Sequence, residues 1–528
     1  MSDLKQSESQ KPHKTPILSE EFSIRSQKLE DIRLQGVDPY PHVFKPSGRA
    51  VDLHQLFEGQ PVGNHEEALE KKTPSYKLAG RLILFRAMGK NAFAQIQDGT
   101  GKIQVMFSRD ITKIPALPTE ENPLKWVEKK IDLGDWIGLQ GHLFRTQKGE
   151  LTLLVEEATL LSKSLHPLPD KHAGLSDKET RYRKRWLDLI ANEDVKKSFE
   201  LRSKILRTIR DFFFEKGYME VETPVLQSIY GGAEARPFTT TLNALDQEMF
   251  LRISLEPSLK KLIVGGYEKV FEIGKVFRNE GLSTRHNPEF TLLEAYAAYN
   301  DYNDMMVLVE TLYERLALET FGTTEVPARL PGSDEVIYLQ MKAPWKRMTM
   351  KEAVKTYGGI DVDAKTEEEL RAILLKTEHV DKEKIKGLSK GLLTGVLFEI
   401  FGEPHLIQPH HIIDHPIETT PFSKLHRDPV EKAKGIVERF ESFIMKTEGA
   451  NSYTELNDPV LQKKLLLDQA HRKEKGDAEA SPYDEDFVEA IEQGMPPTGG
   501  VGIGIDRLVM LFTEAQSIRD VLFFPWMK

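Results

Sequence analysis

The residues best suited to chemistry in this 528-residue chain lie between Phe271 and Tyr296. Two alternating segments flank a polar interval that contains a glycine, which predicts a β-hairpin with a long loop. A turn near residues 283–284 would place Arg278 roughly across from Phe290. The in-phase residues are Glu272, Val276, Arg278 and Glu280 on the first strand and Phe290, Leu292, Glu294 and Tyr296 on the second, with Arg285 in the loop. Such a face suits a charged, planar ligand; a solvated ladder of salt bridges is the alternative, because most surface charge pairs contribute little.

A glycine-rich segment near the C-terminus could bring the backbone close to a ligand. It reads GxGxGxxR, with Gly500, Gly502 and Gly504 followed by Arg507. It is not the dinucleotide fingerprint, because an arginine stands where the third glycine should be, and no P-loop Lys-Ser/Thr follows. The glycines would let a strand pack against a nucleotide, and the helix after them would hold Arg507 at its start.

A second hairpin is predicted after Glu438. Asn451, Tyr453 and Glu455 are spaced by two and therefore share one face. The preceding segment carries His410, His411 and His415, which fit no metal-ligand pattern and are interpreted as sheet histidines.

Residues 76–165 have an all-β pattern of short alternating runs separated by glycine-containing turns. Five strands with this spacing predict a small closed barrel of the OB type, whose face binds single-stranded oligonucleotides by stacking bases on aromatic rings. The candidates for that face are Phe85, Arg86, Phe93, Gln95, Gln104 and Glu150. Burial of Phe93 in the barrel core is the alternative for that ring.

The length predicts an α+β chain with several domains. We expect residues 1–70 to form an N-terminal extension that contains an amphipathic helix. Within this extension we expect residues 1–18 to be disordered. The barrel should follow over residues 71–165. A basic linker follows over 166–190, and a catalytic domain with an antiparallel sheet and flanking helices over 191–528, including a mainly helical insertion near 340–400. The basic run in the linker, Arg181 to Arg185, would contact RNA phosphates or simply solvate a helix.

Composition excludes several classes of protein. The absence of cysteine removes disulfides, thiolate metal sites and cysteine nucleophiles. No apolar run approaches the roughly 20 residues of a membrane span, and the N-terminus lacks an apolar signal core, so we expect a cytoplasmic protein without membrane contact. The net charge of −10 argues against a non-specific polyanion-binding surface, although a locally basic surface can still guide an RNA.

Three segments carry a resemblance to a known family. FRNE followed by RHNPEF is similar to motif 2 of the class II aminoacyl-tRNA synthetases, GYMEVETPVL resembles motif 1, and the GxGxGxxR segment with SIRDVLFFP resembles motif 3. The wording through TLLEAYAAYNDY resembles the bacterial-type lysyl-tRNA synthetases. The three motifs stand in the family's order over about 330 residues, which chance is very unlikely to produce.

The resemblance implies activation of lysine with ATP, followed by lysyl transfer to the 3′ terminal adenosine of tRNA(Lys). It assigns catalytic roles to Arg278 and Arg507. The implied ATP-binding residues are Arg278, Glu280, Arg285, His286, Phe290, Glu441 and Arg507, with adenine between Phe290 and Arg507. The implied lysine-binding residues are Gly232, Glu256, Arg278, Glu294, Tyr296, Asn451, Tyr453 and Glu455.

The resemblance also implies partners outside the pocket. It assigns Mg²⁺ to Glu441 and Glu448, a homodimer interface to the motif 1 region around Pro224, and anticodon contacts to Arg86, Phe93, Gln104 and Glu150. Simple alternation puts Glu448 on the opposite face from Asn451, so we predict a β-bulge near Gly449.

The polar residues of the pocket favour lysine within the class. A buried ammonium needs carboxylates and other acceptors, whereas aspartate and asparagine need donors. The chain departs from the usual family wording at Leu255-Glu256-Pro257, where Pro-Glu-Leu is usual, and at Tyr453, where phenylalanine is common. No residue nominates itself as a general base for transfer to tRNA. An inactive RNA-binding paralogue, or lysyl transfer to a protein, are the competing hypotheses.

Overall fold

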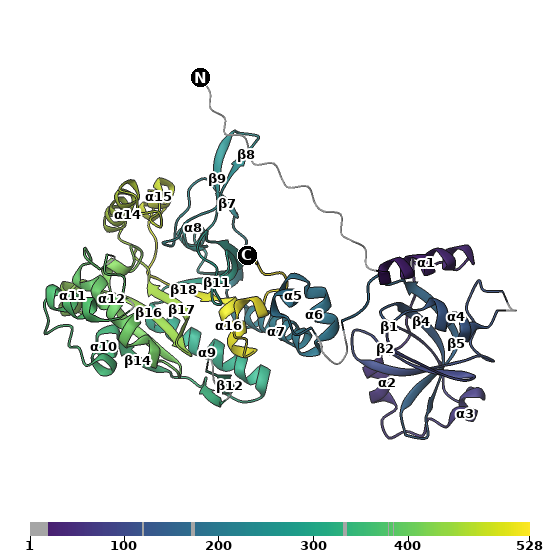
Figure 1. The fold of residues 1–528 in the computed structure, drawn as a ribbon. Helices are drawn as coiled ribbons and strands as arrows, with labels where there is room; N and C mark the ends of the chain where they lie inside the picture. Colours follow the sequence, from purple (N-terminus) through teal and green to yellow (C-terminus); the bar gives the residue numbers. More distant parts are fainter. Residues whose placement is uncertain are drawn as a thin grey trace. The chain divides into compact units, whose positions relative to one another are not determined.

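The computed structural model describes residues 20–118, 121–169, 175–330, 335–378, 380–383 and 385–527. The chain divides into two compact units, residues 1–174 and 175–528 (Figure 1). The N-terminal residues 1–18, for which we expected disorder, lie outside the described residues. No described helix is long and apolar enough to cross a membrane.

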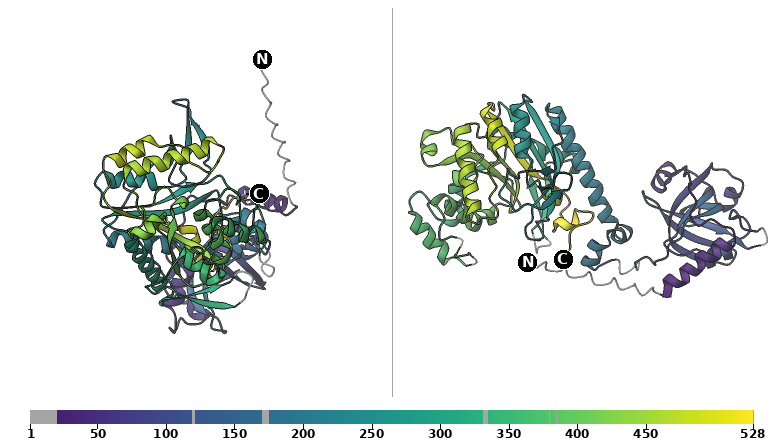
Figure 2. Two further views of the ribbon diagram at one scale, coloured as in Figure 1. Left: turned by 90° about the vertical axis from the view of Figure 1, so that its left-hand side faces the viewer. Right: turned by 90° about the horizontal axis from the view of Figure 1, so that it is seen from above.

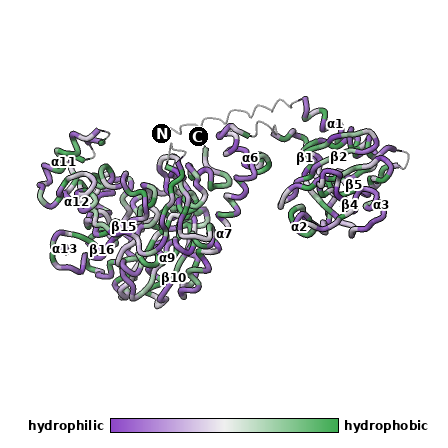
Figure 3. Tube along the Cα trace, turned by 90° about the horizontal axis from the view of Figure 1, so that it is seen from below, coloured by the Kyte–Doolittle hydropathy of each residue, from purple (hydrophilic) through white to green (hydrophobic). Residues whose placement is uncertain are grey.

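The first unit is a closed five-stranded barrel with strand order β1-β2-β3-β5-β4, as the OB-type pattern predicts. Its strands are β1 (Ser75–Met88), β2 (Asn91–Gln97), β3 (Lys102–Ser108), β4 (Trp136–Arg145) and β5 (Leu151–Ser162), and its helices are α1 (Glu20–Leu34), α2 (Ala50–Leu56), α3 (His65–Leu69) and α4 (Pro123–Lys130). Burial alternates strictly along β2, and Figure 3 shows the mixture of hydrophobic and hydrophilic residues along the chain. The alternation lets the same strand fill the barrel and present polar residues outside.

The second unit is built on an eight-stranded sheet with strand order β14-β15-β16-β17-β18-β11-β10-β6. Its strands are β6 (Met219–Glu220), β10 (Lys269–Phe277), β11 (Glu289–Ala298), β14 (Lys346–Thr349), β15 (His410–Pro416), β16 (Ile436–Ile444), β17 (Thr447–Thr454) and β18 (Thr498–Gly504). The central strands are antiparallel, and the pairs at the two edges, β6 with β10 and β14 with β15, are parallel. This agrees with the predicted antiparallel catalytic sheet.

Helices cover both faces of the sheet. The long helices α7 (Glu193–Glu215) and α9 (Tyr302–Phe321) pack on one face together with α16 (Ile505–Phe512), through residues such as Phe213, Val309 and Val509 (Figure 2). On the other face α8 (Glu256–Val264), α14 (Pro459–Glu474) and α15 (Glu485–Glu492) pack around Val276 and Tyr296. The second face is the one that carries the predicted ligand-binding residues.

The insertion after α9 has a hydrophobic core of its own. It contains α10 (Met350–Gly358), α11 (Glu367–Lys376) and α12 (Lys390–Phe401), which bury Val354, Leu374 and Leu397 together. We did not predict the short strands near the insertion. Runs of four or five residues carry little periodic signal. The remaining elements are β7 (Leu226–Gln227), β8 (Thr239–Leu242), β9 (Gln247–Leu251), β12 (Glu325–Arg329), β13 (Val336–Gln340), α13 (Pro429–Ala433) and the 3₁₀ turns Glu403–His405, Ile417–Thr419 and Ile518–Asp520.

Two helices, α5 (Lys178–Arg183) and α6 (Arg185–Ala191), open the second unit where we expected a linker. Arg185, the last residue of the basic run, neither faces solvent nor is free to contact RNA phosphates. Its side chain is 1% exposed and pairs with Asp188 at 2.5 Å. It also donates hydrogen bonds to the backbone carbonyls of Arg519 and Phe523 near the C-terminus. Arg185 therefore fixes the end of the chain against α6.

Candidate active site

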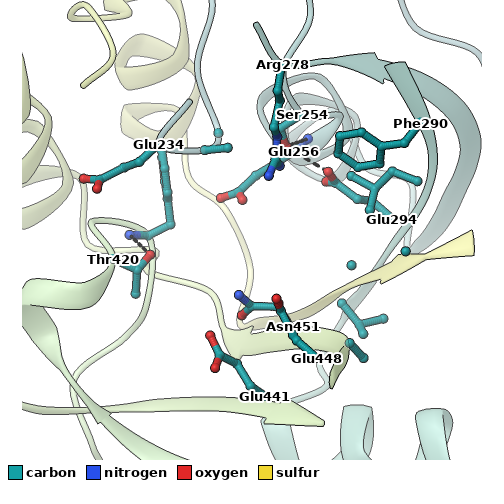
Figure 4. A pocket seen from close by; sticks show the side chains of 18 of the residues that line it. Glu234, Ser254, Glu256, Arg278, Phe290, Glu294, Thr420, Glu441, Glu448 and Asn451 are labelled. Atoms are coloured by element: carbon teal, nitrogen blue, oxygen red, sulfur yellow. Dashed lines mark hydrogen bonds between the residues drawn. The ribbon is translucent and has the colours of Figure 1, made fainter. Parts of the chain in front are cut away.

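The candidate site lies on the second face of the large sheet, above β16, β17, β18 and β11. Glu441, Asn451, Gly502 and Glu294 are successive cross-strand neighbours, and Arg439, Tyr453, Gly500 and Tyr296 form the adjacent row. Directly opposed residues point to the same side of a sheet. These residues line a cavity of about 500 Å³, which Figure 4 shows in close-up.

The residues that the resemblance assigns to ATP, lysine and Mg²⁺ all line this cavity. They are Gly232, Glu256, Arg278, Glu280, Arg285, His286, Phe290, Glu294, Tyr296, Glu441, Glu448, Asn451, Tyr453, Glu455 and Arg507. They come from strands, helices and loops that are up to 275 residues apart in the chain, from Gly232 to Arg507. Segments that are far apart in the sequence therefore form the wall of one cavity.

The register of the β10–β11 hairpin differs from our expectation by two residues. Phe290 pairs with Val276, and the backbone N–H of Arg278 donates to the carbonyl of Pro288. The loop is tightened by Ser283, whose hydroxyl accepts hydrogen bonds from the N–H groups of residues 285 and 286. The side chains still meet, because diagonal neighbours lie within reach of each other: the Arg278 guanidinium carbon is 5.2 Å from the Phe290 ring centroid.

The face of β10 is less uniform than we predicted. Glu272 is buried and forms an ion pair with Arg252 at 2.7 Å, and it also accepts a hydrogen bond from the Thr223 hydroxyl. Val276 belongs to the hydrophobic core under α8. Neither residue lines the cavity, so these two positions are structural.

One end of the cavity is acidic and preorganised. Glu294 accepts hydrogen bonds from the Ser254 hydroxyl at 2.8 Å, the backbone N–H of Leu255 at 3.0 Å and the Tyr296 hydroxyl at 2.9 Å. The Tyr453 hydroxyl donates to Glu256, which gives that hydroxyl the partner that the sequence did not reveal. Figure 4 shows Glu256 and Glu294 on the same side of the cavity as Arg278. The rotamers of the acidic end are thus fixed before a ligand enters.

Burial changes the acidity of these carboxyl groups. It raises the pKa of Glu294 to about 7, and the neighbouring Glu256 contributes to the same direction. Burial also raises the pKa of Glu455 well above its usual range, although Lys260 opposes that shift. An ammonium ligand would reverse both shifts, because an adjacent positive charge favours the ionised carboxylate.

The opposite end of the cavity combines arginines with two carboxylates. Arg439 pairs with Glu441 at 2.7 Å, and Arg507 pairs with Glu448 at 3.3 Å. Arg507 also approaches the His286 ring at 3.2 Å, and burial together with this arginine lowers the pKa of His286. Arg439, Arg507 and His286 are therefore the donors that could meet an anion at this end of the cavity.

The predicted bulge is confirmed. Ser442 pairs with Ala450 and Phe443 pairs with Glu448, so Gly449 is the extra residue on β17. The bulge changes the alternation and lets Glu448 line the cavity with Glu441. Burial and the nearby Glu441 charge both raise the pKa of Glu448. Among the described residues no cluster of three or more His, Cys, Asp or Glu side chains forms a preformed metal site.

The histidines of β15 have structural partners, as expected for sheet histidines. His411 is 0% exposed and lies between the Ser442 hydroxyl at 2.9 Å and the Glu310 carboxylate at 3.1 Å. The His415 ring contacts the carbonyl of Ile412 at 2.9 Å.

The barrel presents a second candidate surface, in the other unit. Arg86 pairs with Phe93 across β1 and β2, and Gln104 pairs with Thr152 across β3 and β5. Phe93 is partly exposed and lies outside the main barrel core, in contact with a small cluster that includes Met106. Phe93 therefore packs partly against hydrophobic residues and keeps part of its ring exposed. Arg86 and Glu150 are exposed, and neither side chain forms an ion pair with another described residue.

Comparison with known proteins covers both units. The profile described as "tRNA synthetases class II (D, K and N)" matches residues 177–528, and "OB-fold nucleic acid binding domain" matches residues 76–161. A lysine–tRNA ligase of Chlamydia caviae is 53% identical over 97% of this chain and 98% of its own length. One of Methanoculleus marisnigri is 46% identical over 95% and 94%, respectively. The chain belongs to the lysine–tRNA ligase family of class II tRNA synthetases.

Membership of the lysine–tRNA ligase family accounts for the presence of both an OB barrel and a large antiparallel sheet in one chain. The class II match contains every predicted cavity residue, and the OB-fold match contains all four predicted barrel residues, from Arg86 to Glu150. Identity of 45% over 97% of the chain extends to a lysine–tRNA ligase of Halalkalibacterium halodurans.

Several residues in or beside the cavity escaped the sequence analysis, among them Ser254, Lys260 and Arg439. Signals for two of them were present. Lys260 follows Glu256 by four positions in a helix, which brings the two side chains together. Arg439 stands two positions before Glu441 in a strand, and therefore on the same face. Ser254 gave no signal, because its role depends on the loop before α8.

Proposed function

We propose that this protein activates L-lysine with ATP and transfers the lysyl group to tRNA(Lys). One observation carries the proposal: a single cavity has buried carboxylates at one end and arginines at the other. In the first step a carboxylate oxygen of lysine attacks the α-phosphorus of ATP, the bond between that phosphorus and the bridging oxygen breaks, and pyrophosphate leaves. The products are lysyl-adenylate and pyrophosphate.

Arg278 is the residue that we propose to act on both reactants. Its planar guanidinium can bind the lysine carboxylate and the α-phosphate together, which positions two anions that repel one another. The same charge stabilises the phosphorane-like transition state, whose oxygens gain negative charge. Its position in the cavity wall, over the Phe290 ring and on the same side as Glu256 and Glu294, supports this role.

The remaining nucleotide contacts follow from the arginine-rich end. We propose that adenine stacks between Phe290 and Arg507, and that Glu280, Arg285 and His286 complete the nucleotide loop. Arg507 then also reaches the γ-phosphate. In the structure Arg507 is held by Glu448 and His286 instead, and these contacts would have to be exchanged for contacts with ATP.

Glu441 and Glu448 fit Mg²⁺ only in the presence of ATP. Magnesium in phosphotransfer sites is held by one or two carboxylates together with substrate phosphates and waters. Burial and, after it, the charge of Glu441 raise the pKa of Glu448, and a bound cation would oppose this shift. When bound, Mg²⁺ would supply charge neutralisation at the phosphates.

The acidic end is the proposed site of the lysine side chain. Glu256, Glu294 and Glu455 provide carboxylates for the ammonium, and Tyr296, Tyr453 and Asn451 provide further contacts. Gly232 has φ +85°, and a Cβ there would come within 2.8 Å of the Pro257 ring. Its backbone is therefore available to the substrate at a position that no side chain could occupy.

We propose that the barrel reads the anticodon of tRNA(Lys) through Arg86, Phe93, Gln104 and Glu150. Phe93 would stack on a base and its neighbours would contact base edges and phosphates.

We also propose a cytoplasmic homodimer through the motif 1 region, where Val225, Leu226 and Ile229 near Pro224 are at least 36% exposed. Light scattering of the wild type and of Leu226→Asp tests the dimer.

The test of the activation step is ATP–pyrophosphate exchange with lysine, aspartate and asparagine in parallel, without tRNA. We expect exchange with lysine alone. Exchange with none of the three would support an inactive RNA-binding paralogue, and exchange with aspartate would contradict the assignment of the acidic end. Charging of tRNA(Lys) then separates transfer to tRNA from transfer to a protein.

A further inference from the structure

A lysine of the protein itself lies inside the proposed lysine-binding end. The side chain of Lys260, from the second turn of α8, is 0% exposed and contacts the carboxylates of both Glu256 and Glu455. Its ammonium also lies 4.9 Å from the Phe422 ring centroid and 5.4 Å from that of Tyr453. Aromatic faces and carboxylates are the groups that stabilise a buried cation.

The two carboxylates that Lys260 contacts differ in how fully they are satisfied. Glu256 accepts from Lys260 and from the Tyr453 hydroxyl. Glu455 forms an ion pair with Lys260 through Oε2, and neither of its two buried oxygens has a hydrogen bond of normal geometry among the described residues. An unpaired buried oxygen of this kind is costly unless a ligand donates to it.

The charges at the acidic end also leave room for a cationic ligand. Three buried carboxylates, Glu256, Glu294 and Glu455, face one internal cation, Lys260. With Lys260 in place and all three carboxylates ionised, two negative charges remain, and protonation of Glu294 or Glu455, whose pKa values are both raised by burial, lowers that number. Without it, the same volume would hold two adjacent carboxylates with no counter-ion between them. The pocket would then be matched to a different number of ligand charges.

We propose that Lys260 is a specificity-determining positioning residue, which holds Glu256 and Glu455 in place and offsets one of their charges so that the pocket accepts a side chain with a single ammonium group. This inference rests on the proposed function, because it concerns the same lysine-binding end. Lys260 acts through the carboxylates and does not touch the reacting atoms.

The first test compares Lys260→Met with Lys261→Met. Both lie on α8 and undergo the same chemical change, but Lys260 pairs with Glu256 and Glu455, whereas Lys261 forms no ion pair with either carboxylate in the described structure. In lysine-dependent exchange we expect K260M to raise the KM for lysine by about tenfold or more, with the KM for ATP unchanged. K261M should behave as the wild type. Binding of lysine and of norleucine, measured calorimetrically, should show that K260M reduces the preference for lysine, which a general loss of structure would not do.

The second test is a double-mutant cycle with Glu455→Gln. If Lys260 offsets the charge of Glu455, K260M should cost less lysine affinity in the E455Q background than in the wild type. Equal losses in both backgrounds, or an unchanged lysine KM in K260M, would overturn the proposal. If K260M does not fold, Lys260→Arg replaces it: we expect a raised KM for lysine with the preference over norleucine retained, and an unchanged KM would again overturn the proposal.

The wild-type protein separates this inference from the proposed function. If the wild type supports no exchange with lysine, the proposed function fails, whatever the variants do. If the wild type activates lysine and K260M does so equally well, the function stands and the role of Lys260 fails.

Discussion

The two candidate sites of this protein treat their polar side chains in opposite ways. In the cavity of the second unit, Glu294 accepts three hydrogen bonds, Glu256 is held by Lys260 and Tyr453, and Arg439 pairs with Glu441. On the barrel, Arg86 and Glu150 are exposed and form no ion pair within the described part of the chain, and Gln104 has one partner, the Thr152 hydroxyl.

This difference corresponds to two kinds of recognition. A buried ionic pocket needs its groups fixed beforehand, because each misplaced charge is costly in a low-dielectric interior. An exposed surface that stacks single-stranded bases gains a moderate amount from each contact and tolerates movement. Substitutions should therefore have large, specific effects in the cavity and small, separable effects on the barrel. The predictions below test that contrast in order of decreasing effect.

The largest effect is expected from Arg278→Ala. Removal of a preorganised charge that stabilises the transition state costs about 10²–10³ in rate, so lysine-dependent exchange should fall by at least this factor. Arg278→Lys keeps the charge but loses the planar fork, and should retain part of the activity. Exchange kinetics of both variants measure this. A mild effect of R278A would remove the contrast between the two sites.

A pair of glycine variants tests how closely the cavity floor is packed. A Cβ at Gly500 would collide with Glu455 and Tyr296, whereas one at Gly502 would meet protein atoms no closer than 3.8 Å. Overpacking costs about 1–3 kcal/mol, so Gly500→Ala should lower thermal stability and raise the KM for lysine. Gly502→Ala should keep the stability of the wild type, and any loss of exchange would then report direct contact between β18 and a ligand. Equal stability of both variants would contradict this packing.

The pH dependence of lysine binding tests the charge of the acidic end. Glu294 has a pKa of about 7 in the ligand-free protein, so it is largely protonated at pH 6 and ionised at pH 8. The ammonium of lysine stays charged over this range, and the Kd for lysine should therefore fall by about tenfold from pH 6 to pH 8. The folded state also holds this proton more tightly than the unfolded chain, so ligand-free stability contributed by Glu294 decreases as pH rises from about 4.5 to 7. Calorimetry without ATP measures the Kd, and Glu294→Gln should bind lysine weakly with no such dependence.

The smallest effect is expected from Phe93→Ala on the barrel. Loss of one stacked base costs about 1–3 kcal/mol, so the KM for tRNA(Lys) in charging should rise severalfold while exchange without tRNA stays unchanged. Phe85, the other aromatic candidate for this face, packs against the barrel core and contacts Phe107, so Phe85→Ala measures the effect of lost packing in the barrel for comparison. A loss of exchange in F93A would mean that the two sites are not separable.

The sequence predicted which residues share a face of a strand better than it predicted contacts between distant segments. Spacing by two placed Asn451, Tyr453 and Glu455 correctly, and the conflict at Glu448 was enough to predict the bulge at Gly449. Alternation within a strand is local information, and it survives folding because neighbouring strands impose it on each other.

Features that depend on three-dimensional neighbours were missed. The β10–β11 register was wrong by two residues because a serine-anchored loop determines it. Arg185 appeared to be part of a solvated basic run, but the C-terminal segment covers it from more than 330 positions away. The role of Lys260 on α8 needs Glu455, which lies directly after β17 and far away in the sequence. No local pattern contains that information.

The most direct test of the account measures charging and exchange with one protein sample and two tRNAs. One transcript is tRNA(Lys) with its uridine-rich anticodon, and the other is the same transcript with that anticodon replaced. We predict efficient lysine charging of the first and weak charging of the second, while lysine-dependent ATP–pyrophosphate exchange is the same whichever transcript is present. Equal charging of both transcripts would contradict the proposed division of work between the barrel and the cavity.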